Sequence, residues 1–76
     1  PHPEIYLTVA EAIGVKPKHC LVFEDTPAGA ESAHRAGCKV IVVTTTHSED
    51  EFTNNPSIVK FIPDFTAINL DELMNL

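Results

Sequence analysis

The stretch CLVFEDTPAGAESAHRAGCKVIVV, residues 20–43, decides the fold. It begins with four apolar residues, 20–23, and ends with the run KVIVV, residues 39–43. Neither run alternates with polar residues, which is typical of strands that are buried on both faces of a parallel sheet. Between the runs, Pro27 predicts the start of a helix and Gly37 predicts its end. The stretch therefore predicts a strand–helix–strand unit with a right-handed crossover.

The sequence on either side continues the same alternation of helices and strands. An earlier helix is predicted from Pro3 to Gly14, because apolar residues recur there every four positions. After the central stretch we expect a short helix at 49–53, opened by a capping box of Ser48 and Glu51. A third strand at 58–62 and a last helix starting near Asn69, with Leu70, Leu73 and Met74 on its apolar side, complete the pattern. The expected class is α/β with a parallel sheet.

A sheet of about three strands is too small to cover itself. Strands that are apolar on both faces need helices above and below and neighbours at their edges. We therefore expect the 76 residues to be a piece of a larger α/β domain or an obligate oligomer, with the start at Pro1 favouring the piece. The partner that covers the sheet would be the missing N-terminal part of the same protein or a second copy.

Charge and composition exclude several classes of protein. The net charge of −6 argues against nucleic acid and against an anionic membrane as partners, because both attract basic surfaces. No apolar run approaches the length of a membrane span, so a cytoplasmic protein is expected. The two cysteines, Cys20 and Cys38, are too few for a disulfide framework, and both are expected to be small buried hydrophobic residues.

Two adjacent carboxylates follow the first predicted strand, the one that looks most central. Glu24 and Asp25 would lie at the carboxyl end of this strand, where open α/β sheets bind ligands. Carboxylate oxygens are the ligands that Mg²⁺ prefers, and Thr26 could orient a carboxylate or a metal-bound water. A structural alternative stays open, in which Asp25 or Thr26 is the N-cap of the helix that Pro27 opens. The four histidines are scattered and lack the spacing of metal ligands.

Several segments resemble the haloacid dehalogenase-like hydrolases. They are PHPEIY at 1–6, CLVFEDTPAG at 20–29, the Ala-Gly pair at 36–37 with the strand after it, and DFT at 64–66. The resemblance is strongest to the β-phosphoglucomutase-like branch of sugar-phosphate phosphatases and mutases. It implies a Rossmann-like three-layer parallel sheet and attack by an aspartate on a phosphoryl group, with an aspartyl-phosphate intermediate and Mg²⁺ as cofactor.

The resemblance assigns only one part of that chemistry to these residues. Glu24 and Asp25 match the metal-binding acids, and Thr26 matches a hydroxyl residue that usually follows them. The nucleophile motif Asp-x-Asp-x-Thr, the Ser/Thr phosphate motif, the Lys before Pro1 and the cap domain do not occur in the sequence. Residues 1–76 therefore match the C-terminal part of the core domain. We predict that the parent is a phosphatase or phosphomutase of a small phosphorylated metabolite, such as a sugar phosphate, and that this chain alone is inactive.

Two other interpretations remain. The chain could be a non-catalytic half-domain that serves as an oligomerisation or interaction module, because the rest of the machinery is missing from it. A receiver-like signalling domain also uses acids at strand ends with Mg²⁺, but it needs an aspartate after a central strand, where this sequence has Thr44 and Thr45.

Overall fold

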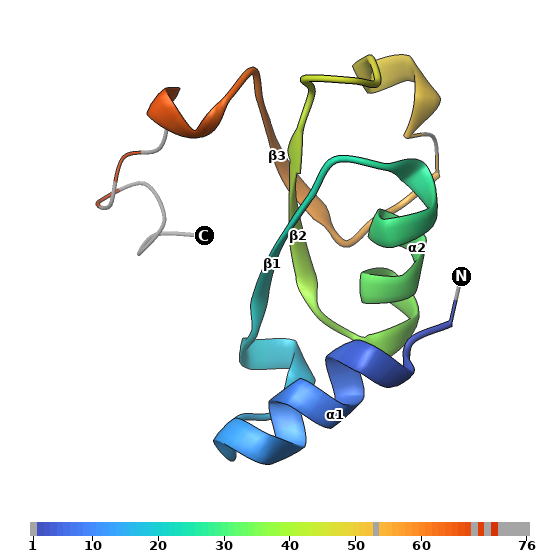
Figure 1. Cartoon of the computed structure of the whole chain (residues 1–76), viewed down its shortest axis with the longest axis vertical. Coiled ribbons are helices and arrows are strands. Elements are labelled where there is room, and N and C mark those ends of the chain that lie inside the picture. Colours follow the sequence, from blue (N-terminus) through green and yellow to red (C-terminus); the bar gives the residue numbers. More distant parts are fainter. Residues whose placement is uncertain (1, 53, 68, 70, 72–76) are drawn as a thin grey trace.

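The computed structural model describes residues 2–52, 54–67, 69 and 71, and in this part of the chain three parallel strands alternate with two α-helices (Figure 1). The predicted α/β class and the parallel sheet are confirmed. The elements are α1 (Glu4–Ile13), η1 (Pro17–His19), β1 (Leu21–Glu24), α2 (Pro27–Ala36), β2 (Lys39–Val43), η2 (Glu49–Glu51), β3 (Ile58–Ile62) and η3 (Phe65–Ala67), where η marks a short 3₁₀ helix.

The strands lie in the order β1–β2–β3, so β2 is the central strand. The expectation that the first strand is the central one was wrong. Strand β2 pairs on both sides, and Val40 to Val43 are buried, whereas every residue of β1 is only half-buried. The β-branched side chains of β2 are buried alternately on the two faces of the sheet. Such residues pack well in this setting.

The two faces of the sheet are covered unequally. Helix α2 lies along one face, and its alanines pack against Val40 and Val42 (Figure 1). Helix α1 packs against α2 on the same side of the sheet. The opposite face carries a smaller cluster built around Ile41, Val43 and Ile62, against which Leu21 and Phe23 of β1 pack.

The predicted ends of the helices agree well with the structure. Gly14 and Gly37 end the two α-helices with φ of 71° and 87°, in the left-handed region that glycine adopts without a steric penalty. The capping box of Ser48 and Glu51 is present, but it opens only the 3₁₀ turn η2, which ends at Glu51 with Phe52 as its cap. The predicted end of this helix, residue 53, lies outside the described residues.

The predicted last helix falls largely outside the described residues. Of its first turn only Asn69 and Asp71 are described, and the Asn69 side chain accepts a hydrogen bond from the Asp71 amide at 2.9 Å. Within the described part of the chain, neither α-helix has the length and apolar character needed to cross a bilayer.

We predict that Ile41→Ala in the natural protein lowers the free energy of unfolding by about 2–5 kcal/mol, because it leaves a cavity beside the central strand. Ile41 is 1% exposed, whereas Val59 on β3 is 39% exposed and provides a matched control. Val59→Ala should change stability by no more than about 0.5 kcal/mol. Guanidinium unfolding followed by circular dichroism measures both variants, and equal shifts in the two would contradict the assignment of β2 as the core strand.

Candidate functional site

The carboxyl ends of the three parallel strands meet at one edge of the sheet (Figure 1). Glu24 is the last residue of β1, and Asp25 and Thr26 follow it directly. The loop after β2 lies beside them, because the Thr46 hydroxyl donates to the main-chain oxygen of Asp25 at 3.5 Å. This edge is where open α/β sheets bind their ligands.

Glu24 faces the helices. Side chains alternate along a strand, and Cys20 and Val22 already pack into the core cluster beneath α2. The Glu24 carboxylate continues this face and accepts a short hydrogen bond from the Tyr6 hydroxyl of α1. Glu24 therefore links β1 to α1 across eighteen residues of sequence.

The same carboxylate lies against the first turn of α2. A Cβ atom at Gly29 would overlap the Glu24 carboxyl group, so only glycine leaves room for it at this position. A negative charge near the N-terminus of a helix is favourable, because the helix dipole places partial positive charge there. Glu24 is thus enclosed by Tyr6 on one side and by Gly29 on the other.

Asp25 has different surroundings. Its residue is exposed, and together with Glu24 it lines a hollow of about 190 Å³ at the edge of the sheet. Thr45 contributes a hydroxyl residue to the same hollow. Phe23 and Phe65 contribute aromatic rings whose centroids lie 5.8 Å apart. The hollow therefore combines a solvent-exposed carboxylate with an apolar wall.

Thr26 is the N-cap of α2. Its side-chain oxygen accepts a hydrogen bond from the Gly29 amide at 3.0 Å, and Pro27 occupies the first turn. The structural alternative for this threonine is confirmed. The cap also fixes where the strand ends and the helix begins, and so it fixes the position of Asp25 between them.

The donor set at this edge is oxygen-rich but incomplete. Among the residues that the structure describes, no three His, Cys, Asp or Glu side chains gather as a metal-binding group. Glu24 already accepts a hydrogen bond from Tyr6, which leaves Asp25 as the accessible carboxylate. Hard oxygen donors of this kind fit Mg²⁺, which takes one or two carboxylates and completes its shell with water and phosphate.

Sequence reasoning missed four contributors to this edge. Tyr6 and Gly29 enclose Glu24, and Thr45 and Phe65 line the hollow beside Asp25. Parallel topology could have placed Thr45 there, since it follows the neighbouring strand. The Tyr6 contact gives no sequence signal, because it depends on how α1 packs.

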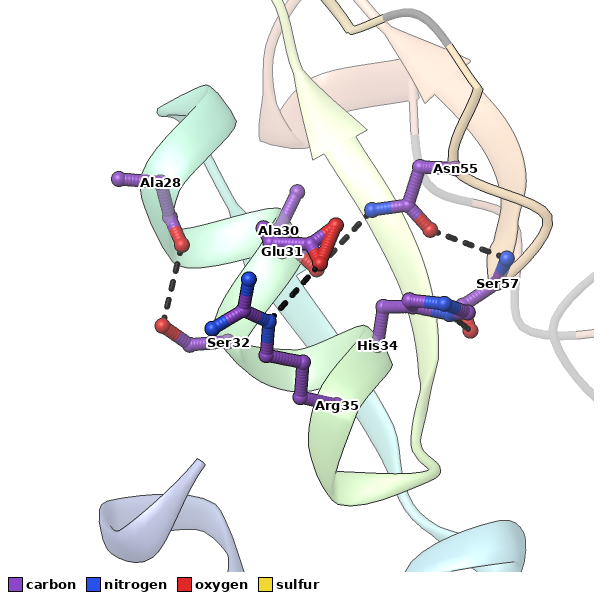
Figure 2. Close-up of polar contacts among 8 residues, drawn as sticks. All are labelled: Ala28, Ala30, Glu31, Ser32, His34, Arg35, Asn55 and Ser57. Atoms are coloured by element: carbon purple, nitrogen blue, oxygen red, sulfur yellow. Dashed lines mark hydrogen bonds and ion pairs between the residues drawn. The ribbon is translucent and has the colours of Figure 1, made fainter. Parts of the chain in front are cut away.

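A second polar cluster lies near the amino ends of β2 and β3, away from the edge with Asp25. Figure 2 shows His34 beside Ser57, with His34 Nδ1 and Ser57 Oγ 2.7 Å apart. The Asn55 amide donates to the Ala30 carbonyl at 3.1 Å, and its oxygen accepts from the Ser57 amide at 3.0 Å. The His34–Ser57 and Asn55–Ala30 contacts join α2 to the segment before β3, so this cluster holds the crossover in place.

Comparison with known proteins points to one family. The family model for haloacid dehalogenase-like hydrolases matches residues 1–37. A haloacid dehalogenase-like hydrolase domain-containing protein of Arabidopsis thaliana is 37% identical over 76 residues, which is 100% of this chain and 23% of that protein. Validoxylamine A 7′-phosphate phosphatase of Streptomyces hygroscopicus subsp. limoneus is 40% identical over 60 residues, covering 79% of this chain and 28% of that protein.

A solved structure has the same fold. The haloacid dehalogenase hydrolase of family IA, variant 3, from Entamoeba histolytica superposes with a TM-score of 0.86 at 33% sequence identity. The superposition covers 99% of this chain and 34% of that one. The chain thus spans about a quarter of the length of the two curated relatives and about a third of the solved structure.

We predict that the Tyr6 phenol in the 76-residue chain titrates above its ordinary pKa of 10. Burial raises this pKa most, and the hydrogen bond to Glu24 and the charge of Glu24 raise it further. Tyr6 is the only tyrosine and there is no tryptophan, so phenolate absorbance reports this group alone. The folded state holds the proton more tightly than the unfolded state, so the stability contributed is complete below pH 10 and is lost as the pH rises beyond it.

The variant Glu24→Gln removes the charge and keeps the size of the side chain, so it should move the Tyr6 midpoint back toward 10. The control Glu11→Gln, at an exposed position of α1, should leave the midpoint unchanged. A midpoint that does not respond to Glu24→Gln would contradict the contact.

Proposed function

Because the chain belongs to the haloacid dehalogenase-like hydrolases, we propose that it is the C-terminal part of the core domain of a Mg²⁺-dependent phosphatase or phosphomutase. One observation carries the proposal: an exposed carboxylate, Asp25, stands at the carboxyl edge of the parallel sheet, beside a hollow. The substrate that we propose is a small phosphorylated metabolite, of the sugar-phosphate class. The validoxylamine A 7′-phosphate phosphatase that the chain resembles supports this class.

Asp25 and Glu24 have separate roles in this proposal. Asp25 would hold Mg²⁺ directly, because its side chain is open to solvent. Glu24 would add negative charge beside the ion that Asp25 holds, and the Tyr6 hydroxyl would orient its carboxylate. Thr26 keeps both in place through its cap on α2. When bound, Mg²⁺ neutralises the charge on the phosphoryl group that is transferred.

The covalent step needs residues that this sequence lacks. An aspartyl-phosphate intermediate requires a nucleophilic aspartate and an acid–base partner, and no Asp-x-Asp motif occurs among the 76 residues. We place these groups, and the cap that selects the substrate, in the rest of the parent polypeptide. The share of the relatives that the chain covers, 23% and 28%, supports this division.

The rest of the parent would also cover the apolar side of α1. Ile5, Val9 and Ile13 on this side are 67%, 52% and 61% exposed. Among the residues that the structure describes, β1 is an edge strand with one side left to pair. An exposed apolar surface of this kind normally marks an interface. The same observation favours the second candidate function, a non-catalytic interaction module.

We predict that Asp25→Asn in the natural protein weakens the apparent Mg²⁺ affinity by about 10–100-fold or more, because the amide cannot supply the charge that the ion requires. Activity on p-nitrophenyl phosphate across a Mg²⁺ titration measures this effect. The control Glu11→Gln removes an exposed carboxylate from α1 and should leave the titration unchanged. An Asp25→Asn enzyme with the activity and Mg²⁺ dependence of the parent would refute the assignment.

The 76 residues expressed alone should show no Mg²⁺-dependent hydrolysis above background, and light scattering should find them self-associated through the exposed apolar side of α1. A stable monomer would count against the proposal that the exposed apolar side of α1 is an interface. Turnover by the isolated chain would count against a nucleophile supplied from outside. A self-associated chain whose natural protein begins at residue 1 would support the interaction module over the enzyme.

A further inference from the structure

Two cysteines lie opposite one another where β1 and β2 begin. Leu21 pairs with Lys39 in the parallel register, and the Lys39 amide donates to the Cys20 carbonyl at 3.1 Å. One position earlier on each strand, Cys20 therefore stands beside Cys38. Neighbouring strands are about 4.7–4.9 Å apart, which falls within the range of about 4.4–6.8 Å between the Cα atoms of disulfide-bonded cysteines.

The two thiols also point to the same face of the sheet. Cys38 belongs to the core cluster beneath α2, and Cys20 packs against that cluster. Burial, together with the nearby Cys20 thiol, raises the pKa of the Cys38 thiol. Both residues line the groove between α1 and β1. Backbone register and a shared face of the sheet thus place the two cysteine side chains next to one another.

The two cysteines differ in how far a reagent can reach them. Cys38 is 2% exposed, whereas Cys20 is half-buried and lies at the groove wall. The Cys20 thiol makes a weak contact, donating to the Lys16 carbonyl at 3.6 Å. Cys20 is therefore the thiol that a small oxidant reaches first, and Cys38 lies behind it.

We propose that Cys20 and Cys38 form a redox-active pair that closes to an intrachain disulfide on reaction with a peroxide. In the first step, the Cys20 sulfur attacks one oxygen of hydrogen peroxide, the O–O bond breaks, and the products are a sulfenic acid and water. In the second step, the Cys38 sulfur attacks the Cys20 sulfur, the S–O bond breaks, and the oxygen leaves as water with the Cys38 proton. The two thiols lose two electrons in total, and the peroxide gains them.

This assignment differs from the expectation that both cysteines are only small hydrophobic residues. Burial among alanines would explain Cys38 alone, but it does not explain why a second thiol stands opposite it on the same face of the sheet. The disulfide would join the edge strand to the central strand around α2, at the end of the sheet remote from Asp25. Oxidation would therefore strengthen the β1–β2 pair without changing the proposed metal ligand.

The test treats the reduced natural protein with one equivalent of hydrogen peroxide, under native conditions and in denaturing guanidinium. Mass spectrometry of a non-reduced digest measures the peptide pair that contains Cys20 and Cys38. We expect this cross-link to form at least about 10-fold faster in the native protein, because the fold already holds the sulfurs together. A glutathione redox buffer under native conditions should reverse it.

Two variants separate the roles of the thiols. Cys38→Ser should stop the reaction at a Cys20 sulfenic acid, which dimedone traps, and Cys20→Ser should leave Cys38 unmodified under the same conditions. Cys38→Ala provides a second version of the first variant in case serine perturbs the core. A cross-link that forms no faster in the native than in the denatured protein, or a Cys38 that reacts when Cys20 is absent, would overturn the proposal.

Discussion

The central strand β2 must be buried on both faces, and the rest of the structure follows from this requirement. Four consecutive β-branched residues, 40–43, cannot turn a side toward water without exposing a large apolar surface. Helix α2 covers one face with alanines, which are small enough to let its backbone lie close to the sheet. The other face receives a thinner layer, built from Ile62 of β3 and from side chains of β1. The described part of the chain completes β2, but it leaves β1 at an edge and α1 with apolar side chains in solvent.

The fold was largely predictable because its signals are local. Pro27, Gly14 and Gly37 mark helix ends through backbone geometry that needs no tertiary contact. The order of the strands was not predictable from these signals, since both runs are apolar throughout and only burial separates the edge from the centre. The helix expected at 49–53 shortened to a 3₁₀ turn for a related reason. Its capping box formed as expected, but a cap fixes the start of a helix and not its length.

The candidate site was predictable in its position but not in its geometry. Consecutive residues at the end of a strand point to opposite sides, so the two acids differ in exposure and in hydrogen-bond partners, although both line the same hollow. Glu24 joins the contacts between the helices, and Asp25 is left at the solvent edge. The partner of Glu24 is Tyr6, which is eighteen residues away and comes into contact only through the packing of α1. Contacts of this kind depend on the assembled structure, and a strand-end motif does not reveal them.

The enclosure of Glu24 limits the order in which this protein can change over generations. A side chain at position 29 needs space that the longer acid at position 24 now occupies. A shorter residue at 24 would free that space and would also leave the Tyr6 hydroxyl without its acceptor. Substitutions at these three positions must therefore occur in a fixed order, because position 24 has to become shorter before position 29 can carry a side chain. The same first substitution removes the hydrogen-bond acceptor of the Tyr6 hydroxyl, so a tyrosine is no longer required at position 6.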